Sequence, residues 1–340
     1  MKRKALVIFC VSMVLLATLV FLYGRSISSQ DHIIRIGYNM ESFNSGPVMV
    51  AFGADIFDKH NLKVELVLLK SGREVQQALA AGRIDIGSAG ATNFFIPISQ
   101  GAPVKIIAPS TVAPTQVFVR PDGEVKKFSD LVGKSIASRP GESSNLALGY
   151  ALKKEGISLN ALEFIDIDKN FRPIALIRNK IVDAAVVGKY EEKIYLDYGA
   201  IPLEEWSTKG YVNKSFPRTV LAVNSNFMNK NKDSVSFFID AFIESQEFIK
   251  DHPDEAAGII AKHLEQGSDG AIKFSIEDIK DSWKELKYVL WHDPNDFVEI
   301  SKIEEEIGDI ESALSLNEIF DLSFEEELKR SQIELYGSTD

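Results

Sequence analysis

Apolar and polar positions along the first third of the chain switch repeatedly between strand-like alternation and helical spacing. Strand, helix, strand, helix and strand are predicted, in that order, over residues 33–40, 46–62, 63–69, 73–82 and 83–87. Gly82 ends the second helix, because glycine readily adopts the backbone conformation that stops a helix. Strands that alternate with helices in this way form a parallel sheet through right-handed crossovers.

The same order of elements recurs about a hundred residues later. A strand, a polar loop and a helix are predicted over 134–157, followed by a strand over 162–167, a helix over 171–180 and a strand over 181–188. The segments 83–87 and 180–184 occupy equivalent places in the two copies. Two matched β-α-β-α-β units predict two similar lobes.

Two β-rich stretches that contain proline connect the copies. They cover 108–123 and 216–228, so we expect the chain to leave the first lobe near Ser110 and to return near Val223. Helices predicted over 233–264, 275–291 and 301–314 would then complete the first lobe. The predicted division is 1–28 as a signal peptide or membrane anchor, 32–111 as the first part of lobe 1, 112–223 as lobe 2, and 224–340 as the rest of lobe 1 with the C-terminal helices.

Two features of the C-terminal part invite a functional interpretation. The acidic run Glu304, Glu305 and Glu306 is expected to be a solvated helix face. Trp283 and Trp291 are expected to belong to the core rather than to contact a ligand. We therefore assign no chemistry to these residues.

The first 24 residues have the layout of an export signal. Lys2, Arg3 and Lys4 precede a run from Ala5 to Gly24 that carries no charge. The run is also close to the roughly 20 residues that span a bilayer, so a cleaved signal and an uncleaved anchor both stay open. Either one places the rest of the chain outside the cytoplasm, with membrane contact only through this segment.

Charge and cysteine content exclude several classes of function. The 340-residue chain has a net charge of −11, and loss of the four positive charges of the signal brings this to −15. An exported domain this acidic is a poor binder of nucleic acid or anionic lipid. Cys10, inside the apolar run, is the only cysteine, so the exported part has no disulfide and no thiolate for catalysis or metal binding.

Polar turns follow the predicted strands at four places in the two copies. They are 39–46, 88–93, 139–145 and 187–192. Open α/β sheets bind ligands beyond the carboxyl ends of their strands, where helix N-termini present free N–H groups. Ser, Thr and Asn at such positions are also ordinary helix caps. Their recurrence in both copies favours a ligand cleft between the lobes.

The sequence lacks the usual catalytic motifs. Its five histidines show no paired metal spacing, and neither G-x-S-x-G, a P-loop nor G-x-G-x-x-G occurs. Asp85 and Asp183 are matched acids on predicted strands, but such acids can be satisfied by neighbouring backbone N–H groups, so we expect both to be structural. No catalytic residue, metal ligand or cofactor is predicted.

Several segments resemble the solute-binding proteins of nitrate-, sulfonate- and taurine-type ABC importers, a superfamily that includes thiamine-precursor-binding proteins. These segments are A-G-x-x-D-I-G at 81–87, L-x-G-K-x-I at 131–136, "LIRNKIVDAAVVGKYE" at 176–191 and "IFDLSFEEELKRS" at 319–331. The resemblance implies an α/β fold of the type II periplasmic-binding-protein kind. In that fold two β-α-β-α-β lobes are joined by a two-strand hinge, and the ligand lies in the cleft between them.

The resemblance also implies a set of ligand contacts. Carried over residue by residue, they are Asn39, Glu41, Ser42, Phe43, Gly90, Ala91, Thr92, Glu142, Ser143, Ser144, Asn145, Lys189 and Tyr190. Many relatives have a Trp and a Pro after the strand predicted here over 181–188, where this chain has Val187 to Tyr190. Glu41 and Glu142 are unexpected in a pocket for a simple anion. A zwitterion or an organic molecule with a basic end, such as a sulfonate/taurine-like zwitterion or a pyrimidine-type thiamine precursor, therefore fits better than nitrate or a bare sulfonate.

The function implied is capture of such a ligand outside the cytoplasm and its delivery, by a monomer, to an ABC permease and its ATPase. An alternative is a membrane-tethered ligand sensor that docks on another membrane protein. A minor alternative is an enzyme like the thiamine-precursor synthases of similar fold, although these rely on cysteine and histidine features that this chain lacks.

Overall fold

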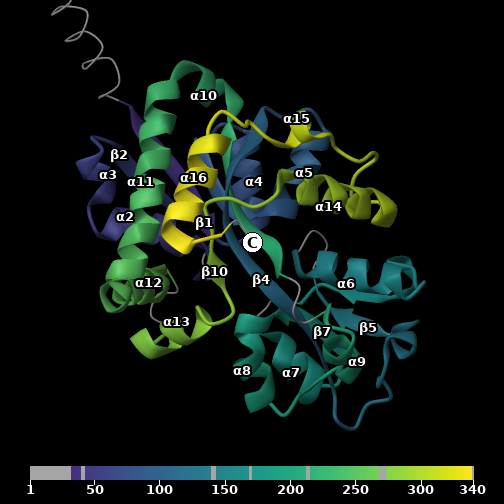
Figure 1. The fold of residues 1–340 in the computed structure, drawn as a ribbon. Coiled ribbons are helices and arrows are strands. Elements are labelled where there is room, and N and C mark those ends of the chain that lie inside the picture. The colour runs from purple at the N-terminus through teal and green to yellow at the C-terminus, as the bar shows by residue number, and fades with distance from the viewer. Residues whose placement is uncertain are drawn as a thin grey trace, which may run out of the picture.

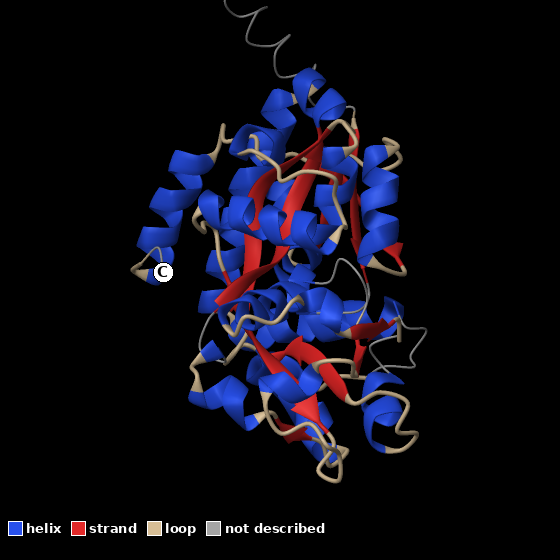
Figure 2. Ribbon diagram, turned by 90° about the vertical axis from the view of Figure 1, so that its right-hand side faces the viewer, coloured by secondary structure: helices blue, strands red, loops and turns tan. Residues whose placement is uncertain are grey.

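The computed structural model describes residues 32–39, 43–138, 143–167, 171–211, 215–267 and 273–338. These parts form an α/β fold of two lobes, with strands in the middle of each lobe and helices around them (Figures 1 and 2). Among the described helices, none combines the length and the hydropathy needed to cross a membrane. The apolar run at 5–24 lies outside the described residues.

The first lobe begins with strands that alternate with helices. Its elements are β1 (Ile33–Asn39), η1 (Phe43–Ser45), α2 (Gly46–Gly53), α3 (Ile56–Lys59), β2 (Lys63–Leu69), α4 (Gly72–Ala80), β3 (Ile86–Gly90) and α5 (Ala91–Ser99). Local chemistry sets the ends of α4. The Ser71 hydroxyl accepts a hydrogen bond from the Glu74 N–H at its start. Gly82 takes a left-handed conformation, with φ of +66°, just after its end.

A long strand, β4 (Val104–Val119), carries the chain into the second lobe. The second lobe contains η2 (Phe128–Leu131), β5 (Ser135–Ala137), α6 (Ser143–Lys154), η3 (Leu159–Ala161), β6 (Glu163–Ile165), α7 (Arg172–Ile177), β7 (Ala184–Gly188), η5 (Lys189–Glu191), α8 (Glu192–Asp197), β8 (Ile201–Pro202) and α9 (Glu204–Thr208). Strand β9 (Ser215–Asn224) then returns the chain to the first lobe.

Helices make up most of the remaining chain and pack on the first lobe (Figure 1). They are α10 (Ser225–Lys230), α11 (Lys232–Asp251), α12 (Pro253–Gly267), α13 (Ile276–Ser282), α14 (Pro294–Ile307), α15 (Leu316–Ile319) and α16 (Glu325–Tyr336), with the short strand β10 (Lys287–Tyr288) before α14. Inner side chains of α11 such as Phe238 and Phe242 are fully buried in a cluster with Ile34 and Ile36 of β1. Burial of these apolar side chains stabilises the contact.

One path of paired strands runs through both lobes, in the order β2-β1-β3-β9-β4-β7-β5-β6. The pairs β1–β2, β1–β3, β5–β6 and β5–β7 are parallel, as the sequence predicts. The two connecting strands differ from this parallel pattern: β9 lies antiparallel between β3 and β4, and β4 runs antiparallel to β7. The reason is topological: β4 leads out of the first lobe and β9 leads back, so the two connecting strands run in opposite directions. They form the two-strand hinge of the fold.

Four predicted helices are interrupted or end early. The helix expected over 233–264 is divided at His252 into α11 and α12, and the segment expected to be helical over 301–314 is helical only as far as Ile307. The helix expected over 46–62 is divided into α2 and α3, because Asp55 between them adopts a left-handed conformation with φ of +56°. The helix expected over 275–291 ends at Ser282, and the following residues pair with Thr111 and Val112 of β4 as β10. Local periodicity could not reveal that a neighbouring strand edge was open at this point.

The third strand lies further along the chain than predicted. The sequence suggested a strand over 83–87 and a turn over 88–93, whereas β3 spans Ile86–Gly90 and α5 follows at once. Small residues suit this strand because it is buried between two neighbours. A Cβ atom on Gly87 would lie 3.0 Å from a methyl group of Val75. The hydroxyl-rich stretch is thus the end of the strand itself.

The prediction that Glu304 to Glu306 form a solvated helix face is wrong for Glu304. Glu305 and Glu306 are exposed, but Glu304 is fully buried. Helix α14 packs against α5, α6 and α15, so its inner face has no access to water. Burial, together with the neighbouring Asp309 carboxyl group, raises the pKa of Glu304 well above its usual value. Neither of its carboxyl oxygens has a hydrogen-bond partner among the described residues.

Candidate ligand-binding site

The first lobe contributes polar groups at the carboxyl ends of β1 and β3. Asn39 is the last residue of β1 and is partly buried. The hydroxyl oxygens of Ser45 and Ser88 lie 2.9 Å apart in a hydrogen bond, and both side chains are buried. This bond joins the segment after β1 to the end of β3.

Helix α5 begins directly at the end of β3. Gly90 is its N-cap and has no side chain to satisfy the first N–H groups. The Asn93 side chain donates back to the Gly90 carbonyl oxygen over 3.3 Å. Ala91 and Thr92 are fully buried in the first turn. Thr92 therefore lies inside the protein and not on an open rim.

The second lobe contributes the start of α6. Ser144 and Asn145 are buried there, and the Ser138 hydroxyl at the end of β5 donates to the Asn145 side chain. Leu146, the next residue, belongs to the same buried cluster as Phe94 of α5. Helix α14 packs against both α5 and α6, so it connects the helix of the first lobe with that of the second. The predicted contacts Glu41, Ser42 and Glu142 lie outside the described residues, as do the side chains of Phe43 and Ser143.

A cluster of four polar side chains, called here the hinge cluster, joins the lobes through the connecting strands. Its members are Asn44 of the first lobe, Tyr190 of the second, Thr115 of β4 and Arg218 of β9. Asn44 donates to the Tyr190 hydroxyl oxygen over 3.4 Å, and Arg218 donates to the Thr115 hydroxyl oxygen over 3.4 Å. The Arg218 guanidinium carbon lies 5.8 Å from the centre of the Tyr190 ring, a cation–π distance.

The chain around Tyr190 is shaped for this contact. A Cβ atom on Gly188 would lie 2.2 Å from the Tyr190 ring, so glycine lets the ring fold back across the strand end. The ring packs against the first-lobe cluster that contains Tyr38 and Met49. The sequence pointed to Tyr190 and to the polar turn 39–46 that contains Asn44, but it gave no reason to select Arg218. The one available signal for Arg218 was a lone basic residue in the apolar stretch 216–223.

Two ion pairs also connect the lobes. Lys189, another predicted ligand contact, lies 2.9 Å from a carboxylate oxygen of Glu285. Lys153 of α6 lies 2.7 Å from Glu306 of α14. The second pair is more than half exposed at both ends, so we expect it to contribute little to stability. Lys189 is three-quarters buried and makes the stronger link.

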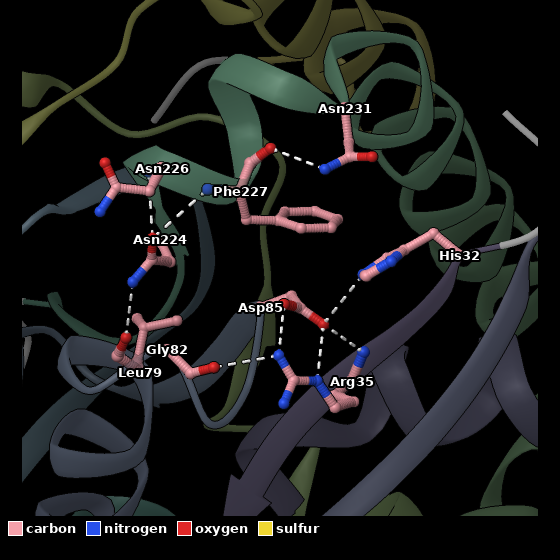
Figure 3. A network of polar contacts seen from close by, with 9 residues as sticks. All are labelled: His32, Arg35, Leu79, Gly82, Asp85, Asn224, Asn226, Phe227 and Asn231. Carbon is pink, nitrogen blue, oxygen red and sulfur yellow. Dashed lines mark hydrogen bonds and ion pairs between the residues drawn. The ribbon is translucent and has the colours of Figure 1, made fainter. Parts of the chain in front are cut away.

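Asp85 and Asp183 have structural roles, as expected. Asp85 accepts hydrogen bonds from the backbone N–H of Arg35 at 2.9 Å and from its guanidinium group at 2.8 and 3.0 Å. Figure 3 shows this network, with His32 on the other side of the carboxylate at 3.8 Å. Asp183 accepts from the backbone N–H and the hydroxyl of Ser135 in the second lobe. Asp85 thus ties the start of β3 to β1, and Asp183 ties the start of β7 to β5.

The surroundings of Asp183 also set its ionisation. Burial acts to raise the pKa of Asp183, but the amide and hydroxyl groups of Ser135 and the guanidinium group of Arg120 hold it below its usual value. An acid held ionised in this way is a poor proton donor near neutral pH. That property agrees with a structural role.

The two tryptophans lie at a cavity and not in the centre of the core. Trp283 and Trp291 are both partly exposed and line a cavity of about 830 Å³ in the first lobe, together with Tyr288, Tyr336 and Gln332. The Trp283 indole N–H donates to the Tyr288 hydroxyl oxygen over 3.1 Å. Within the described residues, no three His, Cys, Asp or Glu side chains are grouped as a metal ion requires.

The fold and the sequence place the protein in a known class. Residues 42–256, well over half of the chain, match the family model described as NMT1/THI5 like. The chain therefore belongs to the NMT1/THI5-like family. Its architecture is the periplasmic-binding-protein fold, in agreement with the resemblance noted from its motifs.

Particular relatives agree with this placement. The chain is 27% identical over 245 residues to a putative binding protein of Brucella abortus (strain 2308), covering 70% of this chain and 74% of that protein. It is 24% identical over 257 residues to the taurine-binding periplasmic protein of Escherichia coli (strain K12), covering 71% and 72% of the two chains. The crystal structure of the periplasmic aliphatic sulphonate binding protein SsuA from Escherichia coli matches with a TM-score of 0.67 at 16% identity, over 85% of this chain and 92% of that one.

Proposed function

We propose that this protein is the solute-binding component of an ABC import system and captures a small polar organic molecule between its two lobes. The observation that supports this most directly is the hinge cluster. Side chains from both lobes and from both connecting strands meet there, at the place where a ligand would touch all four parts at once. Binding proteins with two lobes and a hinge close around their ligands in this way.

The ligand class follows from the polar lining. The proposed contacts are the hydroxyl and amide groups of Asn39, Thr92, Ser144 and Asn145, with Lys189 and Tyr190 at the second-lobe side and Ser45 and Ser88 behind them. A sulfonate or taurine-like zwitterion, or a pyrimidine-type thiamine precursor, offers the matching donors and acceptors. Relatives named for taurine and for aliphatic sulphonates support the first of these choices.

The proposed partners and location follow from the same assignment. The protein would act as a monomer outside the cytoplasm and deliver its ligand to an ABC permease and its ATPase. The N-terminal segment would be the export signal or the anchor that keeps it at the membrane.

Ligand screening on the purified protein tests the binding step. Taurine, alkanesulfonates, pyrimidine precursors and amino-acid-like zwitterions are added separately, and the melting temperature is recorded. A ligand present at 100 times its dissociation constant adds about 2.7 kcal/mol of stability. Small-angle scattering of the best complex should show a smaller radius than the free protein, and an unchanged radius would contradict closure.

Deletion of the gene separates import from sensing. Loss of uptake of the radiolabelled solute, restored by the intact gene, supports import. Normal uptake together with a lost transcriptional response to the same solute would instead identify a tethered sensor.

A further inference from the structure

Arg218 is a buried cation at the junction of the two lobes. Only 5% of its surface is exposed. It lies on β9 next to Thr219, which pairs with Gly90 at the end of β3. Arg218 is therefore one step beyond the last paired residue of β3, beside the point where α5 begins. Ionised side chains are rarely buried this deeply without a specific electrostatic role.

Both lobes and both connecting strands contribute to the contacts around this guanidinium group. Thr115 of β4 accepts one hydrogen bond from it, and the Tyr190 ring of the second lobe lies over it. The Tyr190 hydroxyl group in turn accepts a hydrogen bond from Asn44 of the first lobe. The contact with Tyr190 depends on the position of the second lobe, whereas the contact with Thr115 lies within the hinge.

Two helices of the first lobe begin at the same place. Neither α2 nor α5 has a side-chain cap for its first N–H groups. The hydroxyl of Ser45, the N-cap of α2, bonds to Ser88 instead. The segment η1, which leads into α2, lies against β3, β4 and β9. Unsatisfied N–H groups at a helix start carry a partial positive charge. A positive region thus lies inside a chain whose net charge is −11.

We propose that Arg218 is the specificity-determining residue of the ligand site: it selects solutes that carry an anionic group and couples their capture to the position of Tyr190. This rests on the proposed function as a solute-binding protein. The anionic group would lie between the guanidinium of Arg218 and the first turn of α5. A sulfonate, phosphate or carboxylate accepts several charge-assisted hydrogen bonds from such donors, whereas a neutral head group accepts weaker ones and a cationic head group is repelled.

The first test uses the unmodified protein and does not require the solute to be known. The small-molecule fraction of an extract from the native host is loaded on an anion-exchange resin at a pH above the pKa of amino groups, so that a zwitterion such as taurine is retained through its sulfonate group, and is divided into retained and unretained pools. We expect the retained pool to raise the melting temperature and the unretained pool to leave it unchanged. Stabilisation by the unretained pool alone overturns the role of Arg218 but leaves the proposed function intact. Stabilisation by neither pool overturns both.

The second test compares variants with a chemically defined probe set. Pentanesulfonate, pentylamine and pentanol share one apolar chain and differ only in the head group. We expect the order of affinity to place pentanesulfonate first, with binding that weakens as salt concentration rises. Arg218→Gln should lower the affinity for pentanesulfonate at least tenfold. Arg218→Lys keeps the charge but loses the paired donors of the guanidinium group, so it should lower this affinity less.

Arg178→Gln is the matched control. Arg178 is an exposed arginine of the second lobe whose guanidinium carbon lies 5.2 Å from the centre of the Tyr198 ring, so the variant loses the same kind of cation–π contact away from the hinge. Its affinity for pentanesulfonate should match that of the unmodified protein. If Arg218→Gln binds the sulfonate as well as Arg178→Gln does, or if pentylamine binds more tightly than pentanesulfonate, the proposal is wrong. Arg218→Lys keeps the comparison informative if the glutamine variant fails to fold.

Discussion

Replacement of the two matched aspartates should destabilise the protein to different extents. Asp85→Asn keeps the size of the side chain but places an amide group opposite three donors of Arg35 that lie within 3.0 Å of the carboxylate. Hydrogen bonds to a charged group are each worth about 1.5–3 kcal/mol, and the asparagine retains one acceptor. Because the Arg35 side chain is 35% exposed, solvent screening lowers the total, and we expect a loss of about 2–4 kcal/mol.

Asp183→Asn should cost only about 1–2 kcal/mol, because weaker bonds are lost. The Asp183 side chain is 26% exposed, against 5% for Asp85, and its contacts with Ser135 and Arg120 are 3.0–3.2 Å long. Urea unfolding followed by circular dichroism measures both variants, and Asp58→Asn on the exposed face of α3 serves as the control. The reasoning fails if Asp183→Asn is the more destabilised variant, or if Asp85→Asn unfolds within about 0.5 kcal/mol of the control.

Three further predictions concern the buried acid, the helix starts and the link between the lobes. Because the pKa of Glu304 is raised in the folded protein, the stability that its protonated carboxyl group contributes is fully present below the usual glutamate pKa and is lost as pH rises through the folded value. Glu304→Gln should therefore stabilise the protein by about 1–3 kcal/mol at pH 7 and little at pH 4. Melting curves recorded at both pH values measure this difference. Thr92→Ala and Ser144→Ala should each weaken ligand binding by about 1–3 kcal/mol if they contact the ligand, whereas a loss of stability of about 1 kcal/mol with unchanged calorimetric affinity would reduce them to helix caps. Lys189→Glu should lower the melting temperature of the ligand-free protein by repelling Glu285, and the double variant with Glu285→Lys should recover it; a double variant no more stable than Lys189→Glu would show that the pair does not link the lobes.

The sequence by itself determined much of the fold. Alternation and helical spacing located β1, β2 and α4 of the first lobe, and β5, α6, β6, α7 and β7 of the second, to within a few residues. The roles of Asp85 and Asp183 could also be inferred, since an acid at the start of a buried strand has few partners other than neighbouring N–H groups. The family was recognisable from motifs whose spacing reflects the same strand and helix ends.

Only the tertiary structure decided where distant segments meet. The antiparallel course of β9, the pairing of β10 with β4 and the burial of Glu304 depend on neighbours more than 100 residues away along the chain, or on a helix packed across the lobes. The role proposed for Arg218 also depends on neighbours that are distant in the sequence. Its position in the sequence is that of an ordinary strand residue, and it becomes a candidate ligand contact because Tyr190 and Thr115 approach it from other elements. Local periodicity encodes which face of an element is buried, whereas the side chains that share a site are set by the packing of whole elements against one another.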